Sequence, residues 1–121
     1  MTRPEDALQE AVVAFLQYAL PSDAVLFMIP NSGISGRAGK IFGAKMKRMG
    51  LLAGMPDLGV LHHTFNYFIE LKTKKGRVSP AQRETHKRIR DAGGQVETCR
   101  TVDEVEQYLA GFIQLRAKVA A

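Results

Sequence analysis

The sequence predicts a mixed α/β domain in which a central mixed β-sheet is flanked by helices. Three observations lead to this prediction. Apolar residues recur with helical spacing near both ends of the chain, short apolar runs between them are typical of strands, and capping residues precede the helical segments. The length fits one compact domain over residues 1–121, and an apolar fraction of 45% is that of an ordinary globular protein.

The first helix is expected near the N-terminus. Thr2 can cap it, Pro4 suits its first turn, and Glu5 can complete a capping box. Its apolar stripe, which ends before Pro21, consists of Leu8, Val12, Phe15 and Ala19. A continuous apolar run at residues 24–29 then predicts a buried strand, which the Pro30-Asn31-Ser32-Gly33 segment ends.

A glycine-rich loop leads from this strand into a basic stretch. Three basic residues there are expected on a short helix that ends at Gly50, namely Lys45, Lys47 and Arg48. Residues 57–61 and 65–72 predict two strands joined by a tight connection near His63 and Thr64. The middle of the chain therefore predicts a β-hairpin.

The last third of the chain predicts two helices around one strand. The Ser79-Pro80-Ala81-Gln82 segment opens a helix with a cap, a first-turn proline and a capping-box glutamine, and Gly93-Gly94 closes it. Residues 95–100 predict a final strand, and Thr101 caps a last helix. The inner face of that helix is expected to carry Val105, Tyr108, Leu109 and Phe112.

Charge is distributed unevenly along the chain. Residues 37–90 hold 13 of the 17 Lys and Arg residues but only three of the 12 acids. A basic middle between acidic ends indicates a surface that binds a polyanion such as a phosphate backbone, unless it is simply a solvated surface. The single cysteine, Cys99, suggests a reducing compartment, and the absence of a signal peptide or membrane span makes a cytoplasmic location the expectation.

Two acids and a lysine are expected to meet on one face of the predicted hairpin. If the hairpin is centred on its two-residue connection, Asp57 and Glu70 face each other, with Cβ atoms about 4.5–5.5 Å apart. Because alternate side chains of a strand share a face, Lys72 projects with Glu70, while Ile69 and Leu71 point the other way. Like charges this close destabilise a sheet, so a divalent cation such as Mg²⁺ is expected between the two carboxylates.

These parts together suit the hydrolysis of phosphodiesters. A cation can polarise a phosphoryl oxygen and activate water, and a lysine beside it can assist the attack or stabilise the growing negative charge. Taken singly, Glu-Leu-Lys and Pro-Asp are common pieces of surface strands and turns. Their spacing within the basic segment is what favours chemistry at Asp57, Glu70 and Lys72.

The same residues resemble the PD-(D/E)xK nuclease superfamily, with Pro56-Asp57 followed by Glu70-Leu71-Lys72. Nearly the whole chain is similar to the VRR-NUC family, the virus-type replication-repair nuclease domain, in its stand-alone phage and bacterial form. The segments that carry this resemblance are Glu5, Gln9, Pro30-Asn31, Gly54-Met55-Pro56-Asp57-Leu58, Phe68-Ile69-Glu70-Leu71-Lys72, Gly76 and Ser79-Pro80-Ala81-Gln82.

The resemblance implies an α/β restriction-endonuclease-like core of the αβββαβ type and an Mg²⁺- or Mn²⁺-dependent endodeoxyribonuclease. It implies that Asp57, Glu70 and the backbone carbonyl of Leu71 bind the metal and that Lys72 is catalytic. Stand-alone members act as homodimers on branched DNA such as four-way (Holliday) junctions. A homodimer is also expected here because two symmetric cuts need two active sites.

Two further residues are candidates for supporting the site. Glu5 falls about 40° from the centre of the first helix's apolar stripe and Glu10 about 180° from it, so Glu5 is favoured as a metal-site acid. Its alternative role is to complete the Thr2 capping box. Gln82 matches the glutamine that the family has near its active site, yet it could simply cap its own helix.

Nine basic residues are candidate contacts to the DNA backbone, which as a group would set the affinity and its salt dependence. They are Lys45, Lys47, Arg48, Lys74, Lys75, Arg77, Arg83, Lys87 and Arg88. His62 and His63 do not give the spacing of a His-Asn-His nuclease and are interpreted as turn residues. Cys99 is interpreted as a small core or strand residue.

The chain could instead be a non-catalytic nucleic-acid-binding module with the same fold and basic surface. Such a module predicts that loss of the Asp57 carboxylate leaves every activity intact. The same residues are also compatible with a nuclease that acts on flapped or plain duplex DNA, with a sequence-specific enzyme, and with an RNA-directed nuclease. A panel of linear, flapped, four-way and RNA substrates separates these functions.

Overall fold

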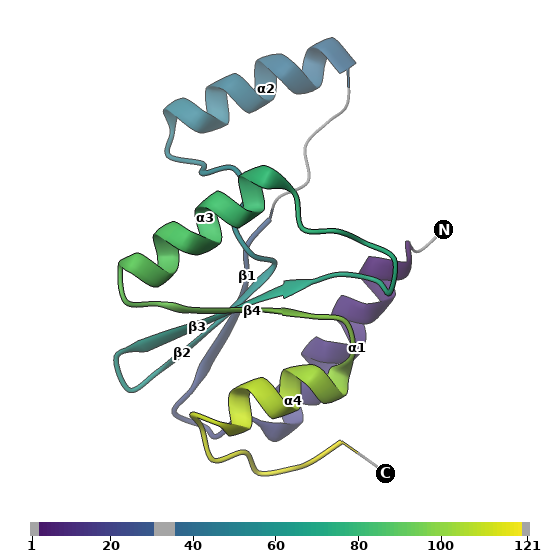
Figure 1. The fold of residues 1–121 in the computed structure, drawn as a ribbon, viewed down its shortest axis with the longest axis vertical. Helices are drawn as coiled ribbons and strands as arrows, with labels where there is room; N and C mark the ends of the chain where they lie inside the picture. Colours follow the sequence, from purple (N-terminus) through teal and green to yellow (C-terminus); the bar gives the residue numbers. More distant parts are fainter. Residues whose placement is uncertain (1–2, 31–35, 120–121) are drawn as a thin grey trace.

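The computed structural model describes residues 3–30 and 36–119 and confirms the predicted mixed α/β fold (Figure 1). The elements are α1 (Pro4–Ala19), β1 (Val25–Met28), α2 (Gly36–Arg48), β2 (Leu58–His62), β3 (Phe65–Leu71), α3 (Pro80–Asp91), β4 (Gln95–Cys99) and α4 (Val102–Ala110). The four strands form one sheet in the order β1-β2-β3-β4. The first three strands are antiparallel, and β4 runs parallel to β3.

The helices cover both faces of the sheet, so the side chains of β3 point alternately toward one layer of helices and toward the other. Helices α1 and α4 lie together against the sheet and supply the core with apolar side chains such as Leu16 and Leu109 (Figure 1). Tyr67, Ile69 and Leu71 of β3 point into this core. Because side chains alternate along a strand, Glu70 is turned to the opposite face, where α3 packs.

The β2–β3 hairpin has the register that the sequence predicts. Leu58 pairs with Ile69 and His62 with Phe65, which leaves His63 and Thr64 as a two-residue turn. Both turn residues have positive φ, 48° and 71°, as a type I′ turn requires. The amide of Asp57, just before β2, donates a 3.1 Å hydrogen bond to the carbonyl of Ile69, which ties Asp57 to β3 beside Glu70.

The first strand differs from the prediction. The run at residues 24–29 was expected to form a buried strand, but β1 lies at the edge of the sheet, where it pairs with β2. Its end residues Val25 and Met28 are 55% and 61% exposed. A continuous apolar run is typical of strands covered on both faces, and here only the middle of the strand is covered.

Two details at the helix ends also differ. The N-cap of α1 is Arg3, without a side-chain cap, so Glu5 does not complete the expected capping box; Thr2 lies outside the described residues. Helix α4 ends at Ala110, and Phe112, expected on its inner face, is half exposed because Ile113 fills that position in the core. The Asn31-Ser32-Gly33 segment also lies outside the described residues.

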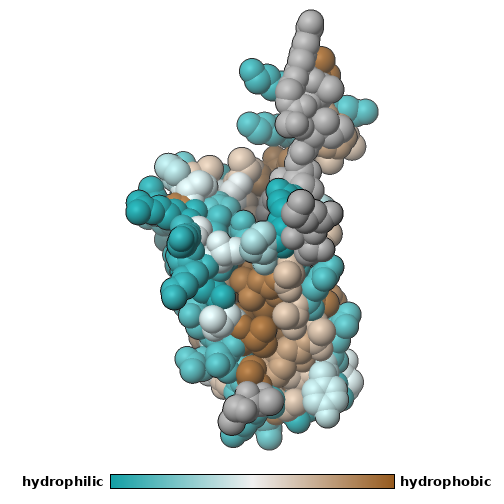
Figure 2. Space-filling view, turned by 90° about the vertical axis from the view of Figure 1, so that its right-hand side faces the viewer, coloured by the Kyte–Doolittle hydropathy of each residue, from teal (hydrophilic) through white to brown (hydrophobic). Residues whose placement is uncertain are grey.

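Helix α2 is longer than expected and stands away from the body of the molecule (Figure 1). In Figure 2, a band of apolar surface runs along the side on which α1 lies in Figure 1, flanked by hydrophilic surface. Within residues 3–30 and 36–119, none of the helices combines the length and the apolar character that crossing a membrane requires.

Candidate active site

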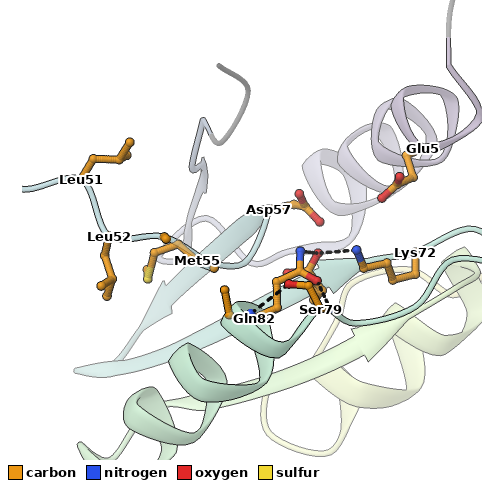
Figure 3. Close-up of a pocket in the computed structure, with 12 residues that line it drawn as sticks. Glu5, Leu51, Leu52, Met55, Asp57, Lys72, Ser79 and Gln82 are labelled. Atoms are coloured by element: carbon orange, nitrogen blue, oxygen red, sulfur yellow. Dashed lines mark hydrogen bonds and ion pairs between the residues drawn. The ribbon is translucent and has the colours of Figure 1, made fainter. Parts of the chain in front are cut away.

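A pocket of about 440 Å³ opens where the starts of β2 and α3 meet the end of β3. Its polar wall includes Asp57, Glu70, Lys72 and Gln82. Of these, Asp57, Lys72 and Gln82 are labelled in Figure 3 and point toward one another. Leu51, Leu52 and Met55 lie on one side of them, and Glu5 of α1 lies on the other (Figure 3). The fold therefore brings together the five side chains that the sequence predicted for the site. They come from α1, the β2–β3 hairpin and α3.

Asp57 is held in place by the neighbouring strand. Its Oδ2 accepts a 2.7 Å hydrogen bond from the backbone N–H of Leu71. Since Leu71 lies between Glu70 and Lys72, this bond fixes the carboxylate of Asp57 to the strand that carries the other two polar groups. Pro56 is buried before it, which restricts the chain that enters β2.

Glu70 is a buried acid with a strongly shifted pKa. Its residue is only 1% exposed. Burial raises the pKa of Glu70 to about 8, the charge of Asp57 opposite adds to the effect, and the nearby Lys72 ammonium partly offsets it. A buried acid beside a second acid is an arrangement that a bound cation would stabilise in its ionised form.

Three polar side chains surround the carboxyl group of Glu70. Nζ of Lys72 lies 3.9 Å from its Oε2, and Nε2 of Gln82 donates to the same oxygen at 3.3 Å. His86 approaches the other oxygen: its Nε2 lies 3.3 Å from Oε1. Contacts from Lys72, two residues further along the chain, and from two side chains of α3 therefore hold the carboxyl group of Glu70 in position.

Gln82 both caps its helix and lines the pocket. Its backbone N–H donates to the Ser79 hydroxyl, and its Oε1 accepts from the backbone N–H of Ser79 at 2.9 Å. This is the predicted capping box. Because the side-chain oxygen is used in the cap, the side-chain nitrogen is left to point at Glu70. The helix start thus orients a residue of the site.

His86 was not predicted to contact the site. It lies four residues after Gln82, one turn further along the same face of α3, and is 3% exposed. Burial, with the charges of Arg90 and Lys72, lowers its pKa, which favours the neutral ring. The spacing from Gln82 was a usable signal, but only the packing of α3 against β3 shows that His86 meets Glu70.

Glycine and threonine position the loop that forms the pocket wall. Gly54 has a φ of +80°, and a Cβ there would collide with the carbonyl oxygen of Ala81 at the start of α3. Thr85 adds a 2.6 Å hydrogen bond from its hydroxyl to the carbonyl of Ala53. This close packing explains the glycine in the Gly-x-Pro-Asp segment and sets the approach to Asp57.

The two candidate acids of α1, Glu5 and Glu10, are distinguished by their positions. Glu5 lines the pocket, and its charge raises the pKa of Glu70, whereas Glu10 is exposed and does not line the pocket. Glu5 is exposed rather than turned toward the core as the helical wheel suggested. It lies at the rim of the pocket in Figure 3.

The candidate DNA contacts are close in the sequence to residues that line the pocket. Lys45, Lys47 and Arg48 are exposed in the last turn of α2, just before Leu51, and exposed Lys74, Lys75 and Arg77 lie between Lys72 and Ser79. Arg83, Lys87 and Arg88 are exposed on α3. Two are engaged in the protein: Lys87 pairs with Asp91 at 2.8 Å, and Arg83 donates to the Val78 carbonyl.

Comparison with known proteins identifies the family and supports the fold. The sequence matches the family model of the VRR-NUC domain over residues 5–103. The chain belongs to the VRR-NUC family. A solved structure titled "VRR_NUC domain protein" is 22% identical, with a TM-score of 0.67 and coverage of 93% of this chain and 90% of the other. Another, titled "VRR_NUC domain", is 19% identical, with a TM-score of 0.57 and coverage of 89% and 96%. No curated protein matches the sequence.

The site of this VRR-NUC domain also fits the metal that such nucleases use. Asp57 and Glu70 offer carboxylate oxygens to the same pocket, and hard oxygen ligands are those that Mg²⁺ and Mn²⁺ prefer. The raised pKa of Glu70 shows that its charge is poorly balanced by the protein alone. The donor set and the electrostatics therefore both suit a divalent cation.

Proposed function

We propose that this VRR-NUC domain, residues 1–121, is a metal-dependent, structure-selective DNA endonuclease that resolves four-way (Holliday) junctions as a homodimer. One observation carries the proposal: Asp57, Glu70 and Lys72 line the same pocket, with Nζ of Lys72 3.9 Å from Oε2 of Glu70. Basic segments flank that pocket in the chain, which suits a phosphate backbone.

Each residue of the site has a distinct role in this proposal. Asp57, Glu70 and the backbone carbonyl of Leu71 hold Mg²⁺ or Mn²⁺, with Glu5 as a further acid at the rim. When bound, the metal polarises the scissile phosphate and makes water a better nucleophile. Lys72 donates to the attacking water or to the phosphate oxygen on which negative charge grows. Gln82 holds Glu70 through the contact described above.

Two arguments support the proposed homodimer, one from the substrate and one from the surface. Two symmetric cuts across a junction need two sites related by two-fold symmetry. Helix α1 exposes Ala7, Ala11 and Ala14 along one side. Exposed apolar surface of this kind suits association with a second copy. The dimer is tested by measuring the mass of the protein in solution by light scattering.

The catalytic proposal is tested with a labelled four-way junction and a linear duplex of matching sequence, each with Mg²⁺, Mn²⁺ or EDTA. Lys72→Met removes the charge and keeps the aliphatic stem, and Lys118→Ala removes an exposed lysine outside the basic segment as a control. We expect metal-dependent cutting of the junction in preference to the duplex. Lys72→Met should lower the cleavage rate by about 10²–10³-fold without weakening junction binding.

Other results would change the assignment. Tight junction binding without cutting in any metal would indicate the non-catalytic binding module. Equal cutting of junction, flap and duplex would keep the nuclease and remove the structure selectivity. Cutting that Lys72→Met and Asp57→Asn leave intact would show that the chemistry lies elsewhere.

A further inference from the structure

A second group of metal-ligating side chains lies at the other end of the β2–β3 hairpin. Nε2 of His62 is 3.2 Å from Oδ1 of Asp23, and Nε2 of His63 is 2.7 Å from Oδ2. We propose that Asp23, His62 and His63 bind a divalent transition-metal ion such as Zn²⁺, Co²⁺ or Ni²⁺. Five residues of extended strand separate His62 from Asp57, about 16 Å, so this site is distinct from the pocket.

The fold assembles this group from segments that the sequence keeps apart. Consecutive residues of a strand point to opposite faces, which would separate His62 from His63. Here the strand ends at His62 and His63 enters the turn with a φ of 48°, so the two rings stack with centroids 3.8 Å apart. Asp23 comes from the connection between α1 and β1, 39 residues before His62.

The distances suit coordination. Ligand atoms of the three residues all lie within 4.8 Å of one another. Zinc binds nitrogen and carboxylate oxygen at about 2.0–2.2 Å, so two ligands of a tetrahedral ion lie about 3.3 Å apart, close to the His62–Asp23 distance. The stacked rings must open for both nitrogens to face one ion, and the side chain of His63, 67% exposed, has room to turn.

The donor set separates this site from the carboxylate pocket by ion preference. Imidazole nitrogens favour zinc, cobalt and nickel, whereas the oxygen ligands of Asp57 and Glu70 favour Mg²⁺. An ion held by all three residues would tie the hairpin turn to the α1–β1 connection. Because the unfolded chain does not hold these residues together, the ion would stabilise the native state.

The test is a Zn²⁺ titration of the chelator-treated full chain by calorimetry, in the presence of millimolar Mg²⁺. His63→Gln and Asp23→Asn each remove one ligand from an exposed position, and Asp103→Asn replaces an exposed acid elsewhere as a control. A fourth variant, Asp57→Asn, removes a carboxylate of the pocket. We expect one Zn²⁺ per chain in the wild type, in Asp103→Asn and in Asp57→Asn, together with a higher Tm.

His63→Gln and Asp23→Asn should bind Zn²⁺ at least about tenfold more weakly and lose the increase in Tm. The proposal is overturned if these two variants bind Zn²⁺ as the wild type does, or if the wild type binds none. Loss of binding in Asp57→Asn alone would assign the ion to the pocket and would overturn it as well. The outcome does not depend on whether the chain cuts DNA.

Discussion

Glu70 combines a buried position with a carboxylate neighbour, and this couples its protonation to the stability of the fold. Its pKa of about 8 lies well above the ordinary glutamate value of 4.5. Between these values the folded protein holds a proton that the unfolded chain has lost. Without metal, the free energy of unfolding must therefore fall as the pH rises from about 4.5 through 8.

We expect Glu70→Gln to remove this pH dependence, because glutamine does not titrate. The metal-free wild type should lose several degrees of Tm between pH 5 and pH 9 relative to Glu70→Gln, as measured by scanning calorimetry. Saturating Mg²⁺ should reduce the difference, since a cation stabilises the ionised carboxylate. Parallel pH profiles of the two metal-free proteins would show that Glu70 has an ordinary pKa.

His86 controls the direction of the Glu70 carboxylate, since an ionised carboxylate only accepts hydrogen bonds and the His86 ring nitrogen can donate one. His86→Leu should raise the Mg²⁺ concentration for half-maximal cleavage by about 10–100-fold. His86→Gln keeps a donor and should recover part of that loss. Direct Mn²⁺ binding measured by calorimetry separates this positioning role from a loss of stability. Equal Mn²⁺ affinity in the wild type and in both variants would show that His86 does not position Glu70.

At the scale of elements, the first turn of α3 links local capping to the site. Ser79 caps α3 and Thr101 caps α4 through equivalent hydroxyl contacts to Gln82 and Glu104. Each replacement by alanine should lower the free energy of unfolding by about 0.5–2 kcal/mol. Only the first of these helix starts carries a side chain that reaches Glu70.

We therefore expect Ser79→Ala to lower kcat/KM for junction cleavage several-fold, while Thr101→Ala leaves it at the wild-type value. The two variants provide a matched comparison, because each removes one cap hydroxyl and only Ser79 caps the helix turn that carries Gln82. Denaturant unfolding and single-turnover cleavage measure the two effects. Equal cleavage by both variants would show that the cap of α3 serves stability alone.

At the scale of the whole molecule, the distribution of charge sets how the chain meets DNA. Lys45, Lys47 and Arg48 project from α2, which stands away from the body of the molecule (Figure 1). Each phosphate contact that releases a counterion adds about 0.9 to the slope of log affinity against log salt. Replacement of all three by glutamine should reduce that slope by about 2–3.

Arg116 and Lys118 provide the control for this measurement, because they are exposed basic residues outside the basic segment. Their replacement by glutamine should leave the slope for junction binding within about 0.5 of the wild-type value. Fluorescence anisotropy over a range of salt concentrations measures both variants. A slope that responds equally to the two replacements would indicate general charge attraction without a binding face.

The sequence alone determined the order of elements, the hairpin register and the central acids. These depend on local chemistry: Ser79 and Gln82 cap α3 within four residues, and the two-residue turn at His63 and Thr64 sets the register that brings Asp57 close to Glu70. The alternation of side chains along β3 then places Lys72 beside Glu70. Features that depend on residues close together in the sequence, such as helix caps and the hairpin register, can be predicted without the tertiary structure.

Only the tertiary structure decided which residues meet across long separations. Strand β1 is half exposed because it takes the edge of the sheet, a position that its apolar run does not encode. His86 contacts Glu70 because α3 packs over β3, and Asp23 reaches His62 because the α1–β1 connection lies beside the hairpin turn. Burial and strand order depend on the whole chain at once, and the pKa of Glu70 depends on both.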